Sequence, residues 1–329
     1  MVEWTSYEHP RLRIPVYSLY GEHREPTAEM LQGLDVLLVD LQDIGARYYT
    51  FIWTMYLCMR ACEQNGVAVV VLDRPNPING VTTEGPVLDL VYKSFVGLHS
   101  IPVRHGKTIG ELAQQFRDEA FPKCRLWILP MKNWNRQIWF DQTGLPWVMP
   151  SPNMPTLDTT TVYPGMCLVE GTNLSEGRGT THPFEFFGAP WLEPFKLAER
   201  LNAVGLPGVR FRPHYFLPKF QKHSGKVCGG VELHVTNRWA FEPYRTGLWC
   251  VKVARDMDTE KFDWRRETYE FVSDRLAIDL LAGSDRYRNL VERGANVDDW
   301  LAEWEEPLRD FASQREEFLL YRATDPQWA

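Results

Sequence analysis

The strongest constraint on the fold is a pair of unbroken apolar runs with a helical segment between them. Residues 36–41 form the first run and residues 68–73 the second, and the runs carry Asp40 and Asp73 at or near their ends. Unbroken runs of this length are typical of parallel strands that are covered on both faces. The segment between them predicts a helix over residues 50–65 that stops at an Asn-Gly pair. This order of elements predicts an α/β fold with a Rossmann-like, doubly wound parallel sheet.

Further elements extend this sheet domain in both directions. Residues 14–20 predict a strand, and residues 26–30 predict the start of a helix. Thr108 is a predicted helix N-cap whose partner is Glu111, which gives Glu111 a capping role before a catalytic one. Residues 125–130 predict another strand of the sheet.

The sequence pattern changes beyond about residue 195. Helices are predicted over residues 194–203, 244–256, 267–281, 285–293 and 297–320, and strands over residues 209–213 and 228–236. Residues 228–236 alternate in polarity as a half-exposed strand does. We therefore expect a first domain over residues 1–165, a second, smaller α+β domain over residues 166–329, and an active-site cleft between them.

Charge and composition exclude several classes of function. The chain has 329 residues, of which 44% are hydrophobic and 24% charged, as in an ordinary globular protein. Its net charge of -7 argues against nucleic acid as a partner, because phosphate binding needs a basic surface. Aromatic residues are abundant, with 13 Trp, 13 Tyr and 17 Phe. In an acidic protein this abundance favours stacking against carbohydrate, although packing of the core explains much of it.

The cysteines and the N-terminus give no evidence for a metal site, a disulfide framework or a signal peptide. The chain has 6 cysteines and no CxxC pair, so the sequence predicts neither a zinc site nor a disulfide framework. Cys58 and Cys62, which lie in the helical segment, are expected to be buried free thiols. No stretch has the length of a membrane span, and the N-terminus lacks the features of a signal peptide, which predicts a cytoplasmic location for the chain as written.

Polar side chains follow both apolar runs, at the edge of the sheet where ligands of such folds bind. They are Asp40, Asp43, Asp73, Arg74 and Asn76. Any one of these aspartates could instead cap the turn that follows it. Two successive strands that end in this way favour a pocket.

A stretch rich in Pro and Gly, residues 149–191, predicts ordered loops over a pocket. Its polar residues are Asn153, Glu170, Asn173, Glu176, Arg178, His182 and Glu185. Glu170 is the strongest carboxylate candidate, because residues 168–169 resemble the end of a strand and a polar turn follows. Arg178 lies between two glycines, where its guanidinium could meet a carboxylate ligand or hold the loop through a salt bridge.

Carboxylates in loops, beside amide and aromatic groups, are what hydrolysis of a glycosidic bond requires. One carboxyl acts as general acid and another as base or nucleophile. His105 and His182 could also transfer protons. The sequence has no zinc-peptidase, serine-hydrolase or P-loop signature, and the Gly-Arg-Gly at residues 177–179 lacks the third glycine of the dinucleotide fingerprint.

Several long motifs resemble the exo-β-N-acetylmuramidase family, long called a domain of unknown function. In the first half of the chain they are residues 16–21, 40–50, 72–77, 84–86 and 102–106. In the second half they are residues 150–154, 163–165, 170–175, 177–180, 183–185 and 188–191. The resemblance covers nearly the whole chain.

The resemblance implies a glycoside hydrolase of cell-wall turnover that removes N-acetylmuramic acid from the non-reducing end of peptidoglycan fragments, without a cofactor or metal. It implies a Rossmann-like domain, a smaller second domain and a site between them. With the loop positions above, the catalytic candidates are Glu170, Asp43 and Glu84. The substrate-binding candidates are Arg47, Tyr48, Asp73, Arg74, Asn76, His105, Asn153, Asn173, Arg178 and Glu185. The lactyl carboxylate of muramic acid gives Arg178, Arg47 or Arg74 a partner.

Family members typically carry a further βα segment, with a Pro-Glu-His-Gly motif whose Glu is a leading catalytic candidate. This sequence begins after that segment, and neither Glu8 nor Glu22 stands in the same context. If the true start lies upstream, we expect a periplasmic or secreted protein. The alternative function is a non-catalytic muropeptide-binding relative that has lost the acid. A nucleotide-dependent oxidoreductase or transferase would rest on the fold alone.

Overall fold

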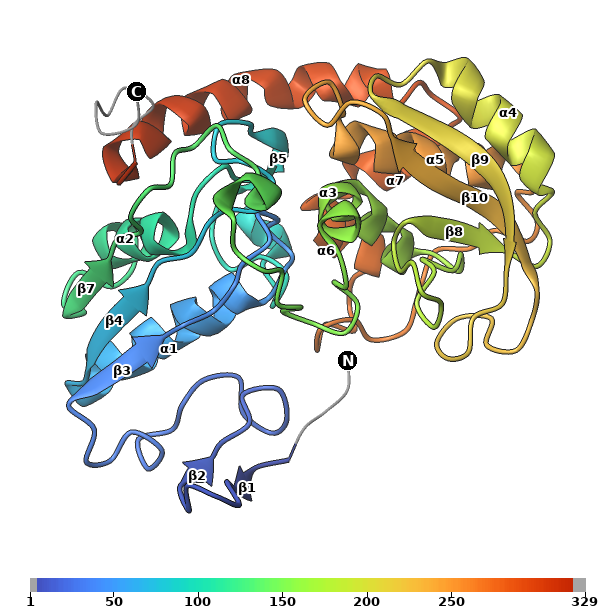
Figure 1. Cartoon of the computed structure of the whole chain (residues 1–329). Coiled ribbons are helices and arrows are strands. Elements are labelled where there is room, and N and C mark those ends of the chain that lie inside the picture. The colour runs from blue at the N-terminus through green and yellow to red at the C-terminus, as the bar shows by residue number, and fades with distance from the viewer. Residues whose placement is uncertain (1–4, 322–329) are drawn as a thin grey trace.

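The computed structural model describes residues 5–321. Its first half contains a three-stranded parallel sheet beside helices α1 (Phe51–Asn65) and α2 (Ile109–Glu119) (Figure 1). Its strands are β3 (Val36–Val39), β4 (Ala68–Leu72) and β7 (Leu126–Leu129), in the order β3-β4-β7. Both neighbouring pairs are parallel. The apolar runs therefore form adjacent parallel strands, as their sequence predicts.

Two helices cover one face of this sheet. Helix α1 (Phe51–Asn65) ends at Gly66, whose φ of 69° is left-handed and therefore suits glycine. Helix α2 (Ile109–Glu119) begins with the predicted capping box: the Thr108 hydroxyl accepts from the Glu111 amide, and the Glu111 carboxylate accepts from the Thr108 amide. The buried side chains of both helices pack with Val39, Val69 and Val71. Both helix predictions are confirmed.

The other face of the parallel sheet is exposed in the part of the chain that the structure describes. Leu38 of β3 is 64% exposed, and Trp127 and Leu129 of β7 are 57% and 61% exposed. The expectation that both faces of β3 are covered is therefore wrong for residues 5–321. Unbroken apolar runs cannot by themselves show whether the second face is covered.

The N-terminal predictions are also wrong. Only Pro15–Val16 of the predicted strand is extended; this is β2, and it pairs with β1 (Tyr7–Glu8) antiparallel and apart from the parallel sheet. Residues 26–34 form turns and no helix. Gly33 has a φ of 78°, which interrupts helical backbone after too few residues for a stable helix.

A small insertion separates β4 from α2. Strand β5 (Glu84–Val87) pairs antiparallel with β6 (Pro102–Arg104), and the short 3-10 helix η1 (Leu90–Tyr92) lies between them. The 3-10 helix η2 (Phe140–Thr143) follows β7.

The second half of the chain is built on an antiparallel sheet. Its strands are β8 (Phe186–Ala189), β9 (Val209–Phe216) and β10 (Cys228–Val235), in the order β8-β10-β9. Its first helices are α3 (Leu157–Met166), α4 (Pro194–Val204) and α5 (Pro243–Met257). Gly165 and Gly247 let α3 and α5 approach closely, because a Cβ at Gly165 would lie 1.7 Å from the Pro243 carbonyl oxygen. This region is α+β, as its sequence predicts.

One of the C-terminal helices, α6, is shorter than predicted. They are α6 (Ala277–Ala282), α7 (Arg286–Glu292), α8 (Asp298–Gln314) and the 3-10 helix η4 (Arg315–Phe318). The helix expected over residues 267–281 is wrong in its first half. Tyr269 and Val272 there exchange two backbone hydrogen bonds of 3.0 Å across a tight turn. Glu270 and Phe271, at the tip, have φ values of 45° and 68°.

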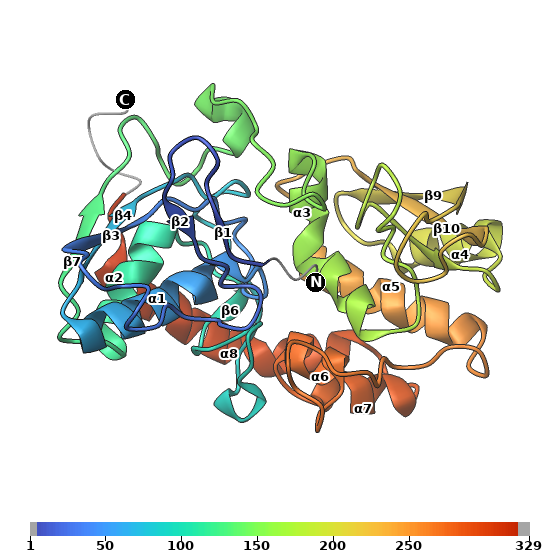
Figure 2. The same ribbon diagram turned by 90° about the horizontal axis from the view of Figure 1, so that it is seen from below.

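Two hydrophobic cores lie side by side, and α8 reaches both of them. The smaller core lies between the parallel sheet, α1 and α2, and the larger core is formed mainly by the second half of the chain. Trp300 and Trp304 of α8 belong to the larger core and Phe311 to the smaller one, with Pro307 between them. Figures 1 and 2 show α8 running from the α7 side of the molecule to the α2 side.

Candidate active site

An open pocket of about 430 Å³ lies beyond the carboxyl ends of the parallel strands. Three residues that the sequence places at this edge, Asp40, Asp73 and Arg74, line it together with Lys132, Asn133 and Trp134. The guanidinium of Arg74 is paired with Asp40, with Nε 2.7 Å from Oδ1. The positive charge of Arg74 is therefore already balanced.

Both oxygens of Asp73 accept hydrogen bonds from other residues of the chain. Its carboxylate accepts hydrogen bonds from the Thr108 hydroxyl, the Gly110 amide and the Tyr321 hydroxyl, each 2.7 Å long. Burial raises the pKa of Asp73 to about 6, although these donors oppose the shift. Asp73 thus fastens α2 and the last described residue to the end of β4.

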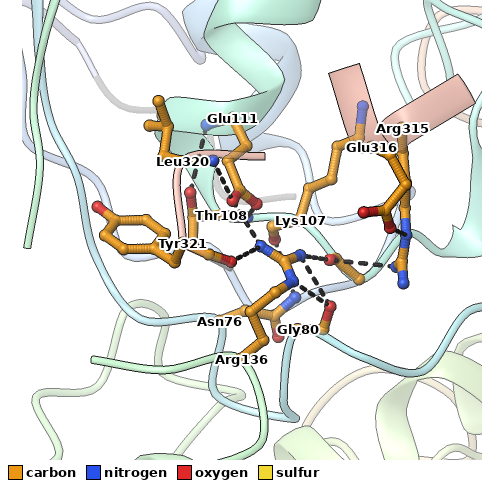
Figure 3. A network of polar contacts seen from close by, with 12 residues as sticks. Asn76, Gly80, Lys107, Thr108, Glu111, Arg136, Arg315, Glu316, Leu320 and Tyr321 are labelled. Atoms are coloured by element: carbon orange, nitrogen blue, oxygen red, sulfur yellow. Dashed lines mark hydrogen bonds and ion pairs between the residues drawn. The ribbon is translucent and has the colours of Figure 1, made fainter. Parts of the chain in front are cut away.

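Asn76 belongs to a second polar network beside Asp73, which Figure 3 shows. Its Nδ2 donates to the Lys107 carbonyl oxygen at 2.9 Å. In the same network Arg136 is paired with Glu111 at 2.5 Å, and the Leu320 amide donates to Glu111 at 2.9 Å. The capping role predicted for Glu111 is confirmed, and this network joins the C-terminal segment to α2.

Asp43 and His105 form a buried pair close to these strand ends. The Asp43 oxygen Oδ2 accepts from the Gly45 amide at 2.8 Å and lies 3.2 Å from His105 Nε2. His105 Nδ1 accepts from the Lys107 amide at 3.2 Å, which leaves the ring proton on Nε2, facing Asp43. The other oxygen of Asp43, Oδ1, is buried and has no donor among residues 5–321.

Three further candidates hold the two halves of the chain together. Arg47 is fully buried and its Nη2 donates to the Leu281 carbonyl oxygen at 2.7 Å. The buried Tyr48 hydroxyl donates to the Pro164 carbonyl oxygen. Glu84 accepts from the Tyr244 amide at 2.8 Å, at the start of α5, and burial raises its pKa to about 7. Because these contacts tie the two halves of the chain together, we leave the three residues out of the proposed site.

Glu170 lies in the 3-10 helix η3 (Cys167–Gly171), which continues α3. The expectation of a strand end before Glu170 is therefore wrong. Its oxygen Oε1 accepts from Arg178 Nη2 at 2.5 Å, and Oε2 accepts from the Tyr269 hydroxyl at 2.9 Å. The carboxylate is thus held at both oxygens by groups from distant loops.

Arg178 lies in a loop that only glycines allow. Gly177 and Gly179 have φ values of 74° and 83°, and a Cβ on Gly179 would lie 2.7 Å from backbone atoms of Phe220. Arg178 Nε is 3.7 Å from Glu176, which is also paired with Lys222 at 3.0 Å. Burial lowers the pKa of Arg178, but Glu170 and Glu176 outweigh it and raise the pKa above its ordinary value.

A row of aromatic rings connects Asp43 with the Glu170 and Arg178 pair. The Tyr49 ring is 6.1 Å from the Tyr163 ring, and the Tyr163 ring is 4.8 Å from the Phe184 ring. Arg178 Cζ lies 5.3 Å from the centre of the Phe184 ring. Burial raises the pKa of Tyr49, and the nearby Asp43 raises it further. The buried rings of Tyr49, Tyr163 and Phe184 thus lead from the neighbourhood of Asp43 to Arg178.

The remaining loop candidates are Glu185, Asn173 and Asn153. Glu185 is buried, accepts from the Thr159 hydroxyl at 2.5 Å and is 3.2 Å from His182 Nδ1. Asn173 donates to the Lys261 carbonyl oxygen at 2.8 Å, so it supports a loop. Asn153 is partly exposed, and its amide donates to Ser151 Oγ at 3.4 Å.

Sequence reasoning missed Glu270. Glu270 lies in the tight turn at residues 269–272, where burial raises its pKa and the charge of Glu170 raises it further. Arg24 Cζ lies 4.0 Å from the centre of the neighbouring Phe271 ring. A Glu-Phe pair inside a charge-dotted, helix-like segment gives no sequence signal of a turn.

The arrangement suits acid–base chemistry on a sugar. It offers a fixed carboxylate at Glu170, a cation at Arg178 and a free carboxylate oxygen at Asp43. Among residues 5–321 there is no group of three or more His, Cys, Asp and Glu side chains that could hold a metal ion. All six cysteines are free and buried. No helix within that range is long and apolar enough to cross a membrane.

Comparison with known proteins covers nearly the whole chain. The profile "Exo-beta-N-acetylmuramidase NamZ, N-terminal" matches residues 1–158, and "Exo-beta-N-acetylmuramidase NamZ, C-terminal" matches residues 161–321. The chain is 47% identical over 316 residues to "Peptidoglycan beta-N-acetylmuramidase NamZ" of Bacillus subtilis (strain 168), which covers 96% of this chain and 74% of that protein.

Two crystal structures of DUF1343 family proteins from Bacteroides fragilis NCTC 9343 are also similar. The first is 34% identical with a TM-score of 0.86 and covers 96% of this chain and 82% of that one. The second is 31% identical with a TM-score of 0.73 and covers 95% of this chain and 81% of that one.

Proposed function

The chain belongs to the exo-β-N-acetylmuramidase family and is a peptidoglycan glycosidase, and we propose that its reaction takes place beside Glu170, Arg178 and Asp43. The substrate is a peptidoglycan fragment with N-acetylmuramic acid at its non-reducing end, such as a muropeptide or the disaccharide with N-acetylglucosamine. The reaction releases that terminal sugar and serves cell-wall turnover.

The main support for this site is the environment of the Glu170 carboxylate. Its two oxygens accept from a guanidinium and a phenol, at 2.5 and 2.9 Å. These two donors fix both oxygens of the carboxylate in position. A positioned carboxylate is what a glycosidase needs on one side of the sugar, either to activate water or to attack the anomeric carbon. We assign Glu170 this role.

Arg178 is the proposed partner of the lactyl carboxylate. Its side chain is 23% exposed, and its Nη1 takes part in none of the hydrogen bonds among residues 5–321. A guanidinium can bind one carboxylate through Nη2 and a second through Nη1. Arg47 is buried and Arg74 is paired with Asp40, so Arg178 is the best placed of the three arginines.

Asp43 is the proposed contact for a polar group of the same sugar. Oδ2 is fixed by the Gly45 amide and faces His105, while Oδ1 remains free. A fixed carboxylate with one free oxygen can accept a hydrogen bond from a sugar hydroxyl or from the acetamido N–H.

We further propose a Rossmann-like region over residues 1–165 and an α+β region over residues 166–329, with the substrate bound between them. The two hydrophobic cores support this division, since each is drawn mainly from one region. The row from Asp43 through Tyr49 and Tyr163 to Arg178 supports the location of the site, because it passes from one region to the other.

The proposal is tested with para-nitrophenyl β-N-acetylmuramide and with a disaccharide that ends in N-acetylmuramic acid. We expect release of the terminal sugar from both, and none from the matching N-acetylglucosaminide, which lacks the lactyl carboxylate. Calorimetry on the same substrates distinguishes the alternative. Binding of the disaccharide without turnover would show a sugar-binding relative and overturn the proposal.

A further inference from the structure

The tight turn at residues 269–272 has a backbone that its sequence does not favour. The two residues at its tip, Glu270 and Phe271, have φ values of 45° and 68°. Two-residue turns of this left-handed kind normally carry Asn or Gly, because a side chain at positive φ is strained. Residues held in such conformations occur where the surrounding structure imposes them, often at active sites.

One contact ties this turn to Glu170, and another holds its other side. The Tyr269 hydroxyl, directly before the tip, donates to Glu170 Oε2 at 2.9 Å. On the other side, the Arg24 guanidinium lies over the Phe271 ring. Glu270 itself is partly exposed, but its oxygen Oε2 is buried and has no hydrogen-bond partner among the described residues. The side chain thus has access to solvent while one oxygen is free of donors.

Glu170 and Glu270 have opposite surroundings. Glu170 is held by a guanidinium and a phenol. For Glu270, burial raises the pKa, the charge of Glu170 adds to this, and Arg24 and Arg178 only partly oppose it. Glu170 thus has a donor on each oxygen, whereas Glu270 has a buried oxygen without a donor among the described residues. A pair of carboxyl groups in unlike surroundings is the arrangement by which glycosidases separate the acid from the base.

Unpartnered buried groups also occur at Tyr49 and Asp43. Tyr49 is 8% exposed and Asp43 is 4% exposed, yet the Tyr49 hydroxyl and Asp43 Oδ1 have no partner within residues 5–321. Buried polar atoms are rarely left unpaired unless a ligand or water completes them.

The charges of Asp43 and Glu270 act on a pair of tyrosines, Tyr49 and Tyr20. Burial raises the pKa of Tyr49, and Asp43 and then Tyr20 add to the shift. Burial also raises the pKa of Tyr20, and Glu270 contributes to that shift.

We propose that Glu270 is the general acid of the glycosidase, which donates its proton to the leaving oxygen while Glu170 acts as the ionised partner. This assignment rests on the proposed function. The bond between C1 and the glycosidic oxygen breaks with its electron pair on that oxygen, and the proton of Glu270 completes the leaving hydroxyl. Glu170 supplies an electron pair to C1, either directly or through a water molecule that it deprotonates.

The test compares two leaving groups in the Glu270→Gln variant. The disaccharide has a poor leaving group and needs the proton, whereas 2,4-dinitrophenyl β-N-acetylmuramide has a leaving group that needs none. We expect kcat/KM on the disaccharide to fall by about 10²–10⁴. On the dinitrophenyl substrate it should fall less than about tenfold. Glu267→Gln is the matched control, because Glu267 is exposed in the same segment and should leave both values unchanged.

The outcomes separate the inference from the function on which it rests. A wild-type protein that cleaves neither substrate overturns the proposed function and the role of Glu270 with it. In an active protein, equal losses on both substrates, or no loss on the disaccharide, overturn the role of Glu270 alone.

A second variant and a pH profile exclude a merely structural role. Glu270→Asp keeps an acid, and aspartate tolerates positive φ better than glutamine does, so we expect partial activity on the disaccharide. A proton donor must be protonated, so wild-type kcat/KM on the disaccharide should fall as the pH rises through the pKa of Glu270. The charges of Glu170, Arg24 and Arg178 act on this carboxyl, and its charge acts on Tyr20. All four residues are unchanged in Glu270→Gln, which should lose that fall. A retained fall would contradict the assignment.

Discussion

Asp73 and Glu170 are both buried carboxylates, one from each half of the chain, yet their surroundings give them different uses. Asp73 ends a parallel strand, and its donors are the start of α2 and the C-terminal Tyr321. Glu170 follows a helix, and its donors, Arg178 and Tyr269, come from loops beside a row of aromatic rings. Position at a strand end is therefore a weaker guide to chemistry than the nature of the donors. A carboxylate whose donors belong to helices and strands stabilises the fold. A carboxylate whose donors are long side chains from loops can also meet a substrate.

The largest effect on turnover is expected for Glu170→Gln. The amide cannot accept a proton from water or attack C1, so kcat should fall by about 10³-fold or more. Steady-state kinetics on the para-nitrophenyl substrate measure this. The amide also loses one of the two acceptors that Arg178 and Tyr269 use, so the free energy of unfolding should fall by about 1–3 kcal/mol while the protein still folds. The surface change Glu199→Gln on α4 is the control. A wild-type kcat in Glu170→Gln would show that Glu170, like Asp73, has only a structural role.

Asp43→Asn sharpens the comparison, because Asp43 lies near the strand ends but keeps a free oxygen. The substitution removes the negative charge that faces His105 and that can bind the sugar. We expect kcat/KM to fall about 10²-fold, on the scale of a misplaced or poorly held substrate. An unchanged kcat/KM would limit the active groups to the second half of the chain.

A smaller effect is expected for Arg178→Lys. Lysine keeps the charge but cannot bind Glu170 and a lactyl carboxylate through separate nitrogens of a planar group. We expect KM for muramic-acid substrates to rise about tenfold, as one charge-assisted hydrogen bond is weakened. Initial rates over a range of substrate concentrations check this, and a change confined to kcat would place Arg178 with Glu170 rather than with the substrate.

Asp73→Asn should leave kcat nearly unchanged and act on stability instead. Every neighbour of the Asp73 oxygens is a donor, so an amide NH₂ group there loses an acceptor at a cost of about 1–3 kcal/mol in the free energy of unfolding. Chemical denaturation measures this cost. A large loss of turnover in a folded Asp73→Asn protein would overturn the contrast with Glu170.

The pH dependence of stability tests the same residue. The pKa of Asp73 is raised from 3.8 to about 6 in the folded protein. A carboxyl group with a raised pKa stabilises the fold most when it is protonated, so its contribution is lost as the pH rises from about 4 to about 6. The fall in the denaturation midpoint over this window should be smaller in Asp73→Asn than in the wild type. Equal falls would show that other groups cause it.

The sequence predicts the parts of this molecule that repeat a local pattern. Residues 36–41 and 68–73 form parallel strands because their apolar runs are long and bounded by turns, and α2 begins where its capping box predicts. The strand predicted over residues 14–20 is wrong, because only β2 (Pro15–Val16) is extended and it pairs with the nearby β1. Whether the second face of β3 is covered depends on distant segments, which no local pattern reports.

The candidate site follows the same rule. Glu170 and Arg178 were found through loop motifs rich in glycine, although the structure before Glu170 is a 3-10 helix rather than a strand. Glu270 was missed because its turn has left-handed backbone without Gly or Asn, so local sequence favours a helix there. Its conformation is set by tertiary contacts of Tyr269 and Phe271.

Helix α8 has a mechanical consequence for substrate entry. It is anchored by Trp300 and Trp304 in one core and by Phe311 in the other, and Pro307 between these anchors removes one backbone hydrogen bond. A rod clamped at both ends bends where it is weakest. Movement of the two cores against each other, as substrate entry between them would require, should therefore bend α8 at Pro307.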